Sequence, residues 1–80
     1  MKPWRRQAAF HFLAARAKLS HAPQLAILEV TARIAQDPYG YEPQPILHPH
    51  GDREIEVAGV WLRYHIDDQN QAVIFLDVTK

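Results

Sequence analysis

The segment GVWLRYHIDDQNQAVIFLDV, residues 59–78, decides the fold of this chain. In its first part, apolar side chains alternate with polar or amphipathic ones: Leu62, Tyr64 and Ile66 against Trp61, Arg63 and His65. A period of two is typical of a β-strand with one buried face. The polar run DDQNQ then predicts a turn, and the nearly continuous apolar run AVIFLDV predicts a central strand. These residues therefore predict two neighbouring antiparallel strands.

A third strand is expected just before this segment. Its side chains also alternate, Arg53, Ile55 and Val57 against Asp52, Glu54 and Glu56. Gly59 separates this run from the next strand, and the short connection indicates an antiparallel pair. We therefore expect a three-stranded antiparallel sheet over residues 52–80.

The first half of the chain predicts two helices. Apolar residues recur at spacings of three and four, the pattern of an amphipathic helix: Trp4, Ala8, Phe12, Ala15 and Leu19. The residues SHA interrupt this pattern, and Pro23 suits the first turn of a second helix. That helix is expected to end at Gln36, because the residue before Pro38 is disfavoured in the helical region. So short a turn predicts an antiparallel helical hairpin.

The two halves are joined by residues 37–51, which are rich in proline and glycine and predict a connector. The sequence thus predicts one domain over residues 1–80. It would comprise a helical hairpin at about 4–36, the connector at 37–51 and the sheet at 52–80. The expected fold class is α+β, with the hairpin packed on one face of the sheet in the order αα-βββ.

Length and composition exclude several classes of protein. The chain has 80 residues and no cysteine, so disulfides, thiolate metal sites and cysteine nucleophiles are ruled out. Its formal net charge of zero argues against a protein whose main task is to bind nucleic-acid phosphates. No run approaches the roughly 18 apolar residues of a membrane-spanning helix, and the start of the chain is unlike a signal peptide. We therefore expect a soluble cytoplasmic protein.

The order of the segments resembles the RelE/ParE family of toxins from type II toxin–antitoxin systems. The resemblance runs from the hairpin ending in IAQDPYG, through the proline-rich connector, to GDREIEVAGVWLRYHIDDQNQAVIFLDVTK. It covers about residues 12–80 and is most specific over 59–78. It implies a RelE/ParE-like fold and a cognate antitoxin as partner. It also implies that no metal or cofactor takes part.

The resemblance leads to two functional hypotheses. In the ribonuclease branch of the family, basic residues on the exposed sheet face neutralise a phosphate of mRNA while the neighbouring 2′-hydroxyl attacks it. The first hypothesis is therefore a toxin that acts as a metal-independent mRNA endoribonuclease, with mRNA or the ribosome as its binding partner. The second is a non-catalytic interaction module, either an inhibitor of DNA gyrase like the ParE branch or a degenerate toxin homologue. A positive sheet face favours the enzyme, whereas carboxylates that neutralise Arg63 favour the module.

Three features depart from the family pattern. Three places before Tyr64, where the family usually has arginine, this chain has Trp61. The chain stops at Lys80, without the C-terminal segment that supplies basic and aromatic residues to many ribonuclease members. The usual first strand is missing, or is reduced to a few residues around Lys2–Trp4. We expect its loss to expose a sheet edge, which could pair with an antitoxin segment or with a second copy in a homodimer.

The expected site lies on one side of the middle strand, which Trp61, Arg63 and His65 share. Under the ribonuclease hypothesis Arg63 is the phosphate ligand, and His65 or Lys80 is the proton donor or charge stabiliser. Trp61 is the candidate platform for a base, and Tyr64 is a further candidate binding residue. These assignments are what the resemblance implies.

A structural interpretation of the same strand is favoured by the residues themselves. Glu54 and Glu56 on the adjacent strand would lie opposite Arg63 and His65 as ordinary cross-strand charge pairs. Carboxylates in those positions would also repel RNA.

Two other groups of residues invite a functional interpretation. His48 and His50 suggest a metal site, but no third ligand lies at a standard spacing, so a polar loop without metal is favoured. The cluster Arg5, Arg6, Arg16 and Lys18 makes the first helix basic. It could contact nucleic acid or an acidic antitoxin segment, but a solvated helix face is the commoner case.

Overall fold

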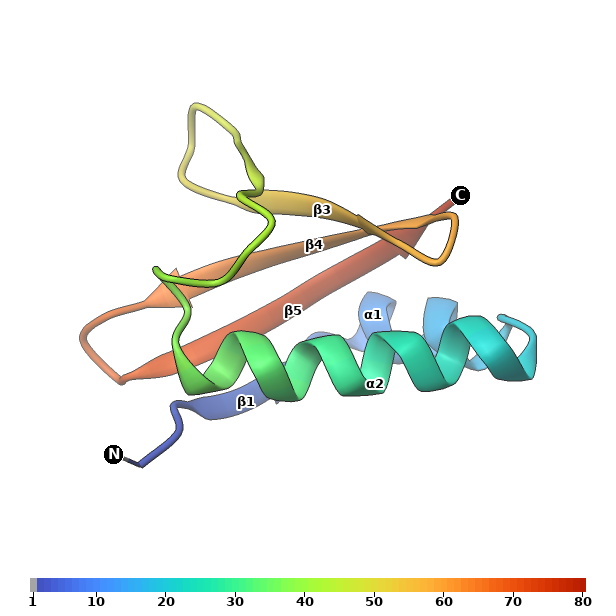
Figure 1. Cartoon of the computed structure of the whole chain (residues 1–80), viewed down its shortest axis with the longest axis horizontal. Coiled ribbons are helices and arrows are strands. Elements are labelled where there is room, and N and C mark those ends of the chain that lie inside the picture. Colours follow the sequence, from blue (N-terminus) through green and yellow to red (C-terminus); the bar gives the residue numbers. More distant parts are fainter. Residues whose placement is uncertain (1) are drawn as a thin grey trace.

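Five strands form one mixed sheet in the computed structural model, which describes residues 2–80. The elements in chain order are β1 Arg5–Ala8, α1 Phe10–Ala17, α2 His21–Gln36, β2 Ile46–Leu47, β3 Arg53–Val57, β4 Val60–Asp67 and β5 Ala72–Thr79. The strand order across the sheet is β1-β5-β4-β3-β2, and both helices pack on the same side of it (Figure 1). The expected α+β class with a helical hairpin on a sheet is confirmed. The expected sheet of three antiparallel strands is not, because β1 and β2 extend it at its two edges.

The three expected strands are all present and antiparallel. β3 pairs with β4, and β4 pairs with β5 in the centre of the sheet. Ala58 and Gly59 connect β3 to β4 with positive φ angles of 51° and 83°. Positive φ at both central residues is the condition for a type I′ hairpin turn, and glycine meets it without steric cost. Local turn chemistry and side-chain alternation therefore specify this part of the fold.

The core lies between the helices and one face of the three central strands. Phe75 on β5 is at its centre, with its ring 5.7 Å from that of Phe12 on α1 and 6.0 Å from that of Tyr64 on β4. From α2, Ile27 and Ile34 are completely buried against the same face. Burial of each large apolar side chain contributes about 1.5–3 kcal/mol, so this cluster is the main source of stability.

The N-terminal segment differs most from the sequence-based expectation. The helix expected from Trp4 begins only at Phe10, and Arg5–Ala8 is a strand that pairs in parallel with β5. The prediction that the first strand is missing or confined to Lys2–Trp4 was therefore wrong. Ala9, with φ −71° and ψ 156°, keeps the chain extended up to the helix. The residues of this strand, RRQA, contain two adjacent arginines and no apolar period of two, so the strand left no signal in the sequence.

The second helix and the connector differ less. α2 begins at His21, slightly before the expected start, and ends at Gln36 as predicted. Pro23 lies in its first turn, where its missing N–H costs no helical hydrogen bond. The connector contains the two-residue strand β2, which pairs with β3 at the sheet edge opposite β1. Within residues 2–80, neither helix is both long and apolar enough to cross a membrane.

Candidate functional site on the open sheet face

The sheet face opposite the helices carries the row of side chains that the sequence singles out. Along β4, residues alternate strictly between buried and half-buried, and Trp61, Arg63 and His65 are all half-buried on this open face. The prediction that these three side chains share one face is confirmed. Their neighbours on the strand, including Tyr64, point into the core on the other side.

Arg63 lies between two carboxylates on the neighbouring strands. Glu54 of β3 and Asp77 of β5 are its direct partners in the two strand registers. Cross-strand partners have Cβ atoms roughly 5 Å apart, so both carboxylates lie in the immediate field of the guanidinium. The strand register places Glu54 opposite Arg63 as expected, but within residues 2–80 no ion pair joins the two side chains, and the Glu54 carboxylate contacts His48 instead. Glu56 lies opposite Trp61 and not opposite His65. Asp77 was not foreseen, because a register shift in β5 next to Arg63 decides which residue faces it.

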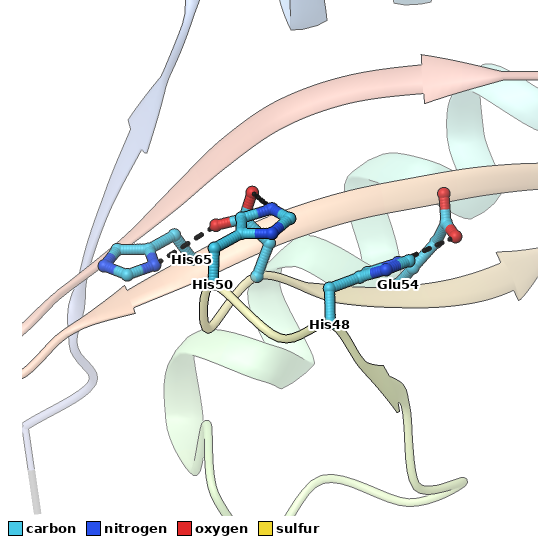
Figure 2. A network of polar contacts seen from close by, with 5 residues as sticks. His48, His50, Glu54 and His65 are labelled. Atoms are coloured by element: carbon cyan, nitrogen blue, oxygen red, sulfur yellow. Dashed lines mark hydrogen bonds and ion pairs between the residues drawn. The ribbon is translucent and has the colours of Figure 1, made fainter.

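His65 belongs to a network of histidines and carboxylates at one corner of the open face (Figure 2). Its Nδ1 lies 3.3 Å from Oδ1 of Asp52, and the other oxygen of Asp52 lies 2.9 Å from Nε2 of His50. Next to them, Nε2 of His48 lies 3.2 Å from Oε1 of Glu54. The rings of His48 and His50 are hydrogen-bonded to these carboxylates, whereas the buried Nδ1 of His65 is close to Asp52 but makes no hydrogen bond within residues 2–80.

The same network bears on the metal-site interpretation. The turn at residues 48–51 brings His48 and His50 together, with ring centroids 5.9 Å apart. Within residues 2–80, no group of three or more His, Asp or Glu side chains is arranged to hold a metal ion. His50 and His65 share the carboxylate of Asp52, each at a different oxygen, whereas His48 faces Glu54.

The open face as a whole is acidic. The strand registers and the contact of Asp52 with His65 assign to it the acidic residues Asp52, Glu54, Glu56, Asp67 and Asp77. Two arginines share the face, Arg63 and Arg5. Arg5 is assigned to it because it pairs with Ala72, which in turn pairs with Asp67. Hydrogen bonds from Asn70 hold the pKa of the Asp67 carboxyl below its usual range, so this group stays charged. A phosphate approaching Arg63 would meet net negative charge.

The remaining candidate residues are not gathered around Arg63. Tyr64 has no exposed surface, and burial raises the pKa of its hydroxyl to about 12, so it presents nothing to a ligand on the open face. Lys80 follows β5 and lines a hollow with His11 and Lys18 beside α1. It lies six residues beyond Ile74, the partner of His65, which is about 20 Å along a strand. His65 and Lys80 therefore lie toward opposite ends of the β4–β5 ladder.

Comparison with solved structures identifies the fold. The toxin–antitoxin complex RelBE2 from Mycobacterium tuberculosis contains a chain that matches with a TM-score of 0.80 and 21% identity, covering 98% of this chain and 91% of that one. The isolated RelE toxin from Escherichia coli matches with a TM-score of 0.82 and 16% identity, over 96% of this chain and 83% of that one. This chain has the RelE fold. The resemblance noted in the sequence is thereby confirmed at the level of structure.

Further RelE-fold neighbours come from complexes with an antitoxin. The archaeal RelE–RelB complex from Pyrococcus horikoshii matches with a TM-score of 0.75 and 12% identity, over 98% of this chain and 94% of that one. By sequence, no family model and no curated protein matches this chain. The RelE fold is therefore retained here at a level of identity at which side-chain chemistry is free to differ.

Proposed function

We propose that this chain is the toxin-family component of a type II toxin–antitoxin system, and that it acts by binding a partner protein and not by cleaving RNA. The first part is supported by the likeness of nearly the whole fold to RelE chains solved with RelB. The second part is supported by one local observation, the carboxylates that flank Arg63 on both sides. An antitoxin is the proposed partner.

The argument against cleavage is electrostatic. A reaction on the phosphate backbone needs positive charge where the transition state becomes more negative, and loss of one such donor typically lowers the rate by about 10²–10³. Here the single central cation has an anion on each neighbouring strand, at Glu54 and Asp77. Both would repel the phosphate that Arg63 attracts. Trp61, where the family usually has arginine, supplies no replacement charge.

A second candidate function is metal-independent cleavage of mRNA, and one observation favours it. The open face of β4 carries three side chains in a row: the indole of Trp61, the guanidinium of Arg63 and the imidazole of His65. In that mechanism Arg63 would bind the scissile phosphate and His65 would transfer the proton. Lys80 would stabilise charge only if the C-terminal residues moved toward the site.

The two functions are separated by a cleavage assay with the purified protein. In a translating extract, we expect no new mRNA ends with the wild type, as judged by primer extension, and the same result with Arg63→Ala. Cleavage by the wild type that disappears in Arg63→Ala would establish the ribonuclease. Lys18→Ala, a basic residue away from the open face, controls for the loss of one positive charge.

The toxin–antitoxin assignment is tested by co-expression with the product of the adjacent gene. We expect the two proteins to form a stable complex on size-exclusion chromatography. Expression of the chain alone should arrest growth, and co-expression of the adjacent gene product should relieve that arrest. Arrest with DNA-damage signalling and continued translation would identify gyrase as the target. Failure to form any complex with the adjacent gene product would contradict the assignment.

A further inference from the structure

The end of the open face around Trp61 is bordered by acidic residues. Glu56 of β3 is the direct partner of Trp61 in the strand register. Glu54 of β3 and Asp77 of β5 occupy its diagonal positions, two residues along from its direct partners. Diagonal neighbours on one sheet face lie within reach of long side chains. The indole is therefore surrounded by carboxylates on both neighbouring strands.

Most of this negative charge has no cation bound to it. Glu54 contacts His48 at 3.2 Å, but within residues 2–80 neither Glu56 nor Asp77 forms an ion pair. Glu56 is exposed, and Asp77 is half-buried, where its Oδ1 accepts a 2.8 Å hydrogen bond from the amide of Val78. A half-buried carboxylate is screened less by water than a fully solvated one, so a cation placed beside it is attracted more strongly.

Arg63 does not cancel the charge at this end of the face. It is the next residue along the row from Trp61, and it lies between Glu54 and Asp77. Its guanidinium forms no ion pair within residues 2–80. With Glu56 included, three acidic residues stand against this one basic residue. The surface around the indole therefore favours a cationic ligand.

The indole itself narrows the chemistry of that ligand. Trp61 is half-buried on the open face. Indole is the side chain that attracts cations most strongly through its ring, and the planar guanidinium of arginine also stacks on it. A guanidinium lying on this ring would have carboxylates on both sides to accept its N–H groups. Arginine therefore fits this surface better than lysine.

The spacing of the acidic residues favours an extended chain as the carrier of that arginine. Glu54 and Glu56 are two residues apart on β3, so their Cα atoms are about 6.5 Å apart on the same face. Asp52, just before the strand, continues the row beside His65. Alternate side chains of an extended peptide have the same spacing. A segment with a basic residue at every second position would thus place each cation next to a carboxylate.

We infer that the Trp61 end of the open face binds an extended segment of a partner protein that has arginine at alternate positions. One guanidinium stacks on the indole between Glu56 and Asp77, and the next one pairs with Glu54. The inference rests on the proposed function, since it gives the chemistry of the protein segment that this face binds in place of RNA.

Charge decides against a second copy of this chain as the occupant. Two open faces placed together would bring Glu56 and Asp77 of one copy next to acidic residues of the other, and like charges in contact are destabilising. Arg16 and Lys18 have the alternate spacing in sequence, but they lie at the end of α1. Residues two apart on a helix do not face the same side, so this pair cannot serve as the extended segment.

The test uses the full chain and a short blocked peptide of alternating Arg and Ser. The indole Nε1–H signals in NMR spectra locate the binding, because the chain has two tryptophans and the variant Trp4→Phe assigns them. The peptide should shift the signal of Trp61. The signal of Trp4 should stay in place, because that ring packs against the core and beside Tyr39 on the helix side.

Matched probes separate recognition from general attraction of charge. Affinities are measured by fluorescence anisotropy of the labelled peptides. A peptide of alternating Lys and Ser should bind about threefold more weakly, because an ammonium group neither stacks nor forks. A peptide with the same Arg and Ser content in two blocks should also bind about threefold more weakly, and alternating Glu and Ser should not bind. Single-stranded RNA that binds more tightly than the Arg–Ser peptide and shifts Trp61 would overturn the inference.

Variants of the protein locate the contacts. Glu56→Gln should weaken the Arg–Ser peptide about threefold and Trp61→Leu about fivefold. Combining Glu56→Gln with Glu54→Gln and Asp77→Asn should weaken it at least about tenfold. Glu29→Gln, which removes an exposed carboxylate from α2 on the other side of the sheet, should leave the affinity unchanged. Equal losses in Glu29→Gln and Glu56→Gln, or an unmoved Trp61 signal, would overturn the inference.

The outcome can be told apart from that of the toxin–antitoxin assignment. If the adjacent gene product forms a complex but the Arg–Ser peptide does not shift Trp61, the docking site is wrong and the proposed function stands. If the peptide binds as described but no complex forms with that product, the docking site stands and the toxin–antitoxin assignment is wrong.

Discussion

The two faces of the sheet have opposite electrostatic character. On the open face, acidic residues outnumber basic ones, and both strands beside Arg63 place a carboxylate next to it. On the helix side, the hollow at the β1 edge is lined by Arg6 and Arg16 with no acidic residue. The chain as a whole has no net charge. Neutrality therefore conceals a separation of charge across the sheet, and it says little about which partner each surface selects.

This separation changes how the RelE fold should be interpreted here. The resemblance implies an RNA site on the sheet face, but a polyanion would meet Glu54 and Asp77 there. The basic residues Arg6 and Arg16 instead line the hollow at the β1 edge. The same fold thus supports catalysis or binding according to which face carries the positive charge.

The largest contrast should appear between neighbouring residues of β4 that point to opposite faces. Leu62 has no exposed surface, whereas Trp61 is half-buried on the open face. We expect Leu62→Ala to lower the free energy of unfolding by about 2–5 kcal/mol. Trp61→Ala should lower it by about 1 kcal/mol, because solvent already reaches the indole. Urea denaturation measures both, and equal losses would mean that the open face is covered in solution.

Alkaline pH should destabilise the protein through Tyr64. Burial raises the pKa of its hydroxyl from 10.0 to about 12. Below pH 10 the group is protonated in both states and its contribution is fully present. As pH rises from 10 to 12, only the unfolded chain loses the proton, so stability falls by roughly 2–3 kcal/mol. Tyr64→Phe should remove this loss in denaturation curves measured across that range.

The same variant makes a prediction at neutral pH. The hydroxyl of Tyr64 is buried and has no hydrogen-bond partner among residues 2–80. Its removal in Tyr64→Phe should therefore change stability at pH 7 by less than about 1 kcal/mol. Tyr39→Phe is the matched control, because the pKa of Tyr39 is raised mainly by its hydrogen bond to Asp68 at an exposed site. A large loss in Tyr64→Phe at pH 7 would point to a bound water on the hydroxyl.

Removing the acidic residues beside Arg63 should make the open face more like an RNA site. We expect the double variant Glu54→Gln, Asp77→Asn to bind single-stranded RNA about tenfold more tightly than the wild type at low salt. Arg63→Ala in that background should abolish the gain. Fluorescence anisotropy at several salt concentrations measures it. An unchanged affinity in the double variant would show that these carboxylates do not govern RNA binding.

The smallest effect concerns Asp67 at the end of β4. Its pKa is lowered chiefly by the side-chain amide of Asn70, which donates a 2.8 Å hydrogen bond to Oδ2. Asn70→Ala should raise the pKa of Asp67 toward its ordinary value. The pKa should remain somewhat low, because the backbone amide at position 70 still donates to Oδ1. Carboxyl titration by NMR measures this shift, and a pKa that does not move would assign the effect to the backbone.

The parts of the fold that local patterns specify could be predicted from the sequence. Alternation located β3 and β4, the apolar run located β5, and the residue before Pro38 ended α2. The row formed by Trp61, Arg63 and His65 followed from the same alternation. These features depend on side-chain period and turn chemistry, which a single segment contains.

The missed features depend on contacts between distant segments. β1 is held by its pairing with β5, and the residues RRQA by themselves do not predict that pairing. The position of Asp77 beside Arg63 depends on a register shift in β5. The hollow with Arg6 and Arg16 required the location of β1 relative to both helices. Tertiary arrangement decided these features, and local propensity did not.

The pairing of β1 with β5 also determines when the sheet can be completed during synthesis. Arg5 lies beside Ala72, so β1, which is synthesised before the other four strands of this sheet, is joined to β5, which is synthesised after them. The helices and the β3–β4 hairpin emerge earlier, but the strand that carries Phe75, on which Phe12 packs, is still being made. Until it arrives, the nascent chain exposes its leucines and its unpaired edges. A partner that associates co-translationally would meet this open form, and it would thereby shield the chain from aggregation before the fold closes.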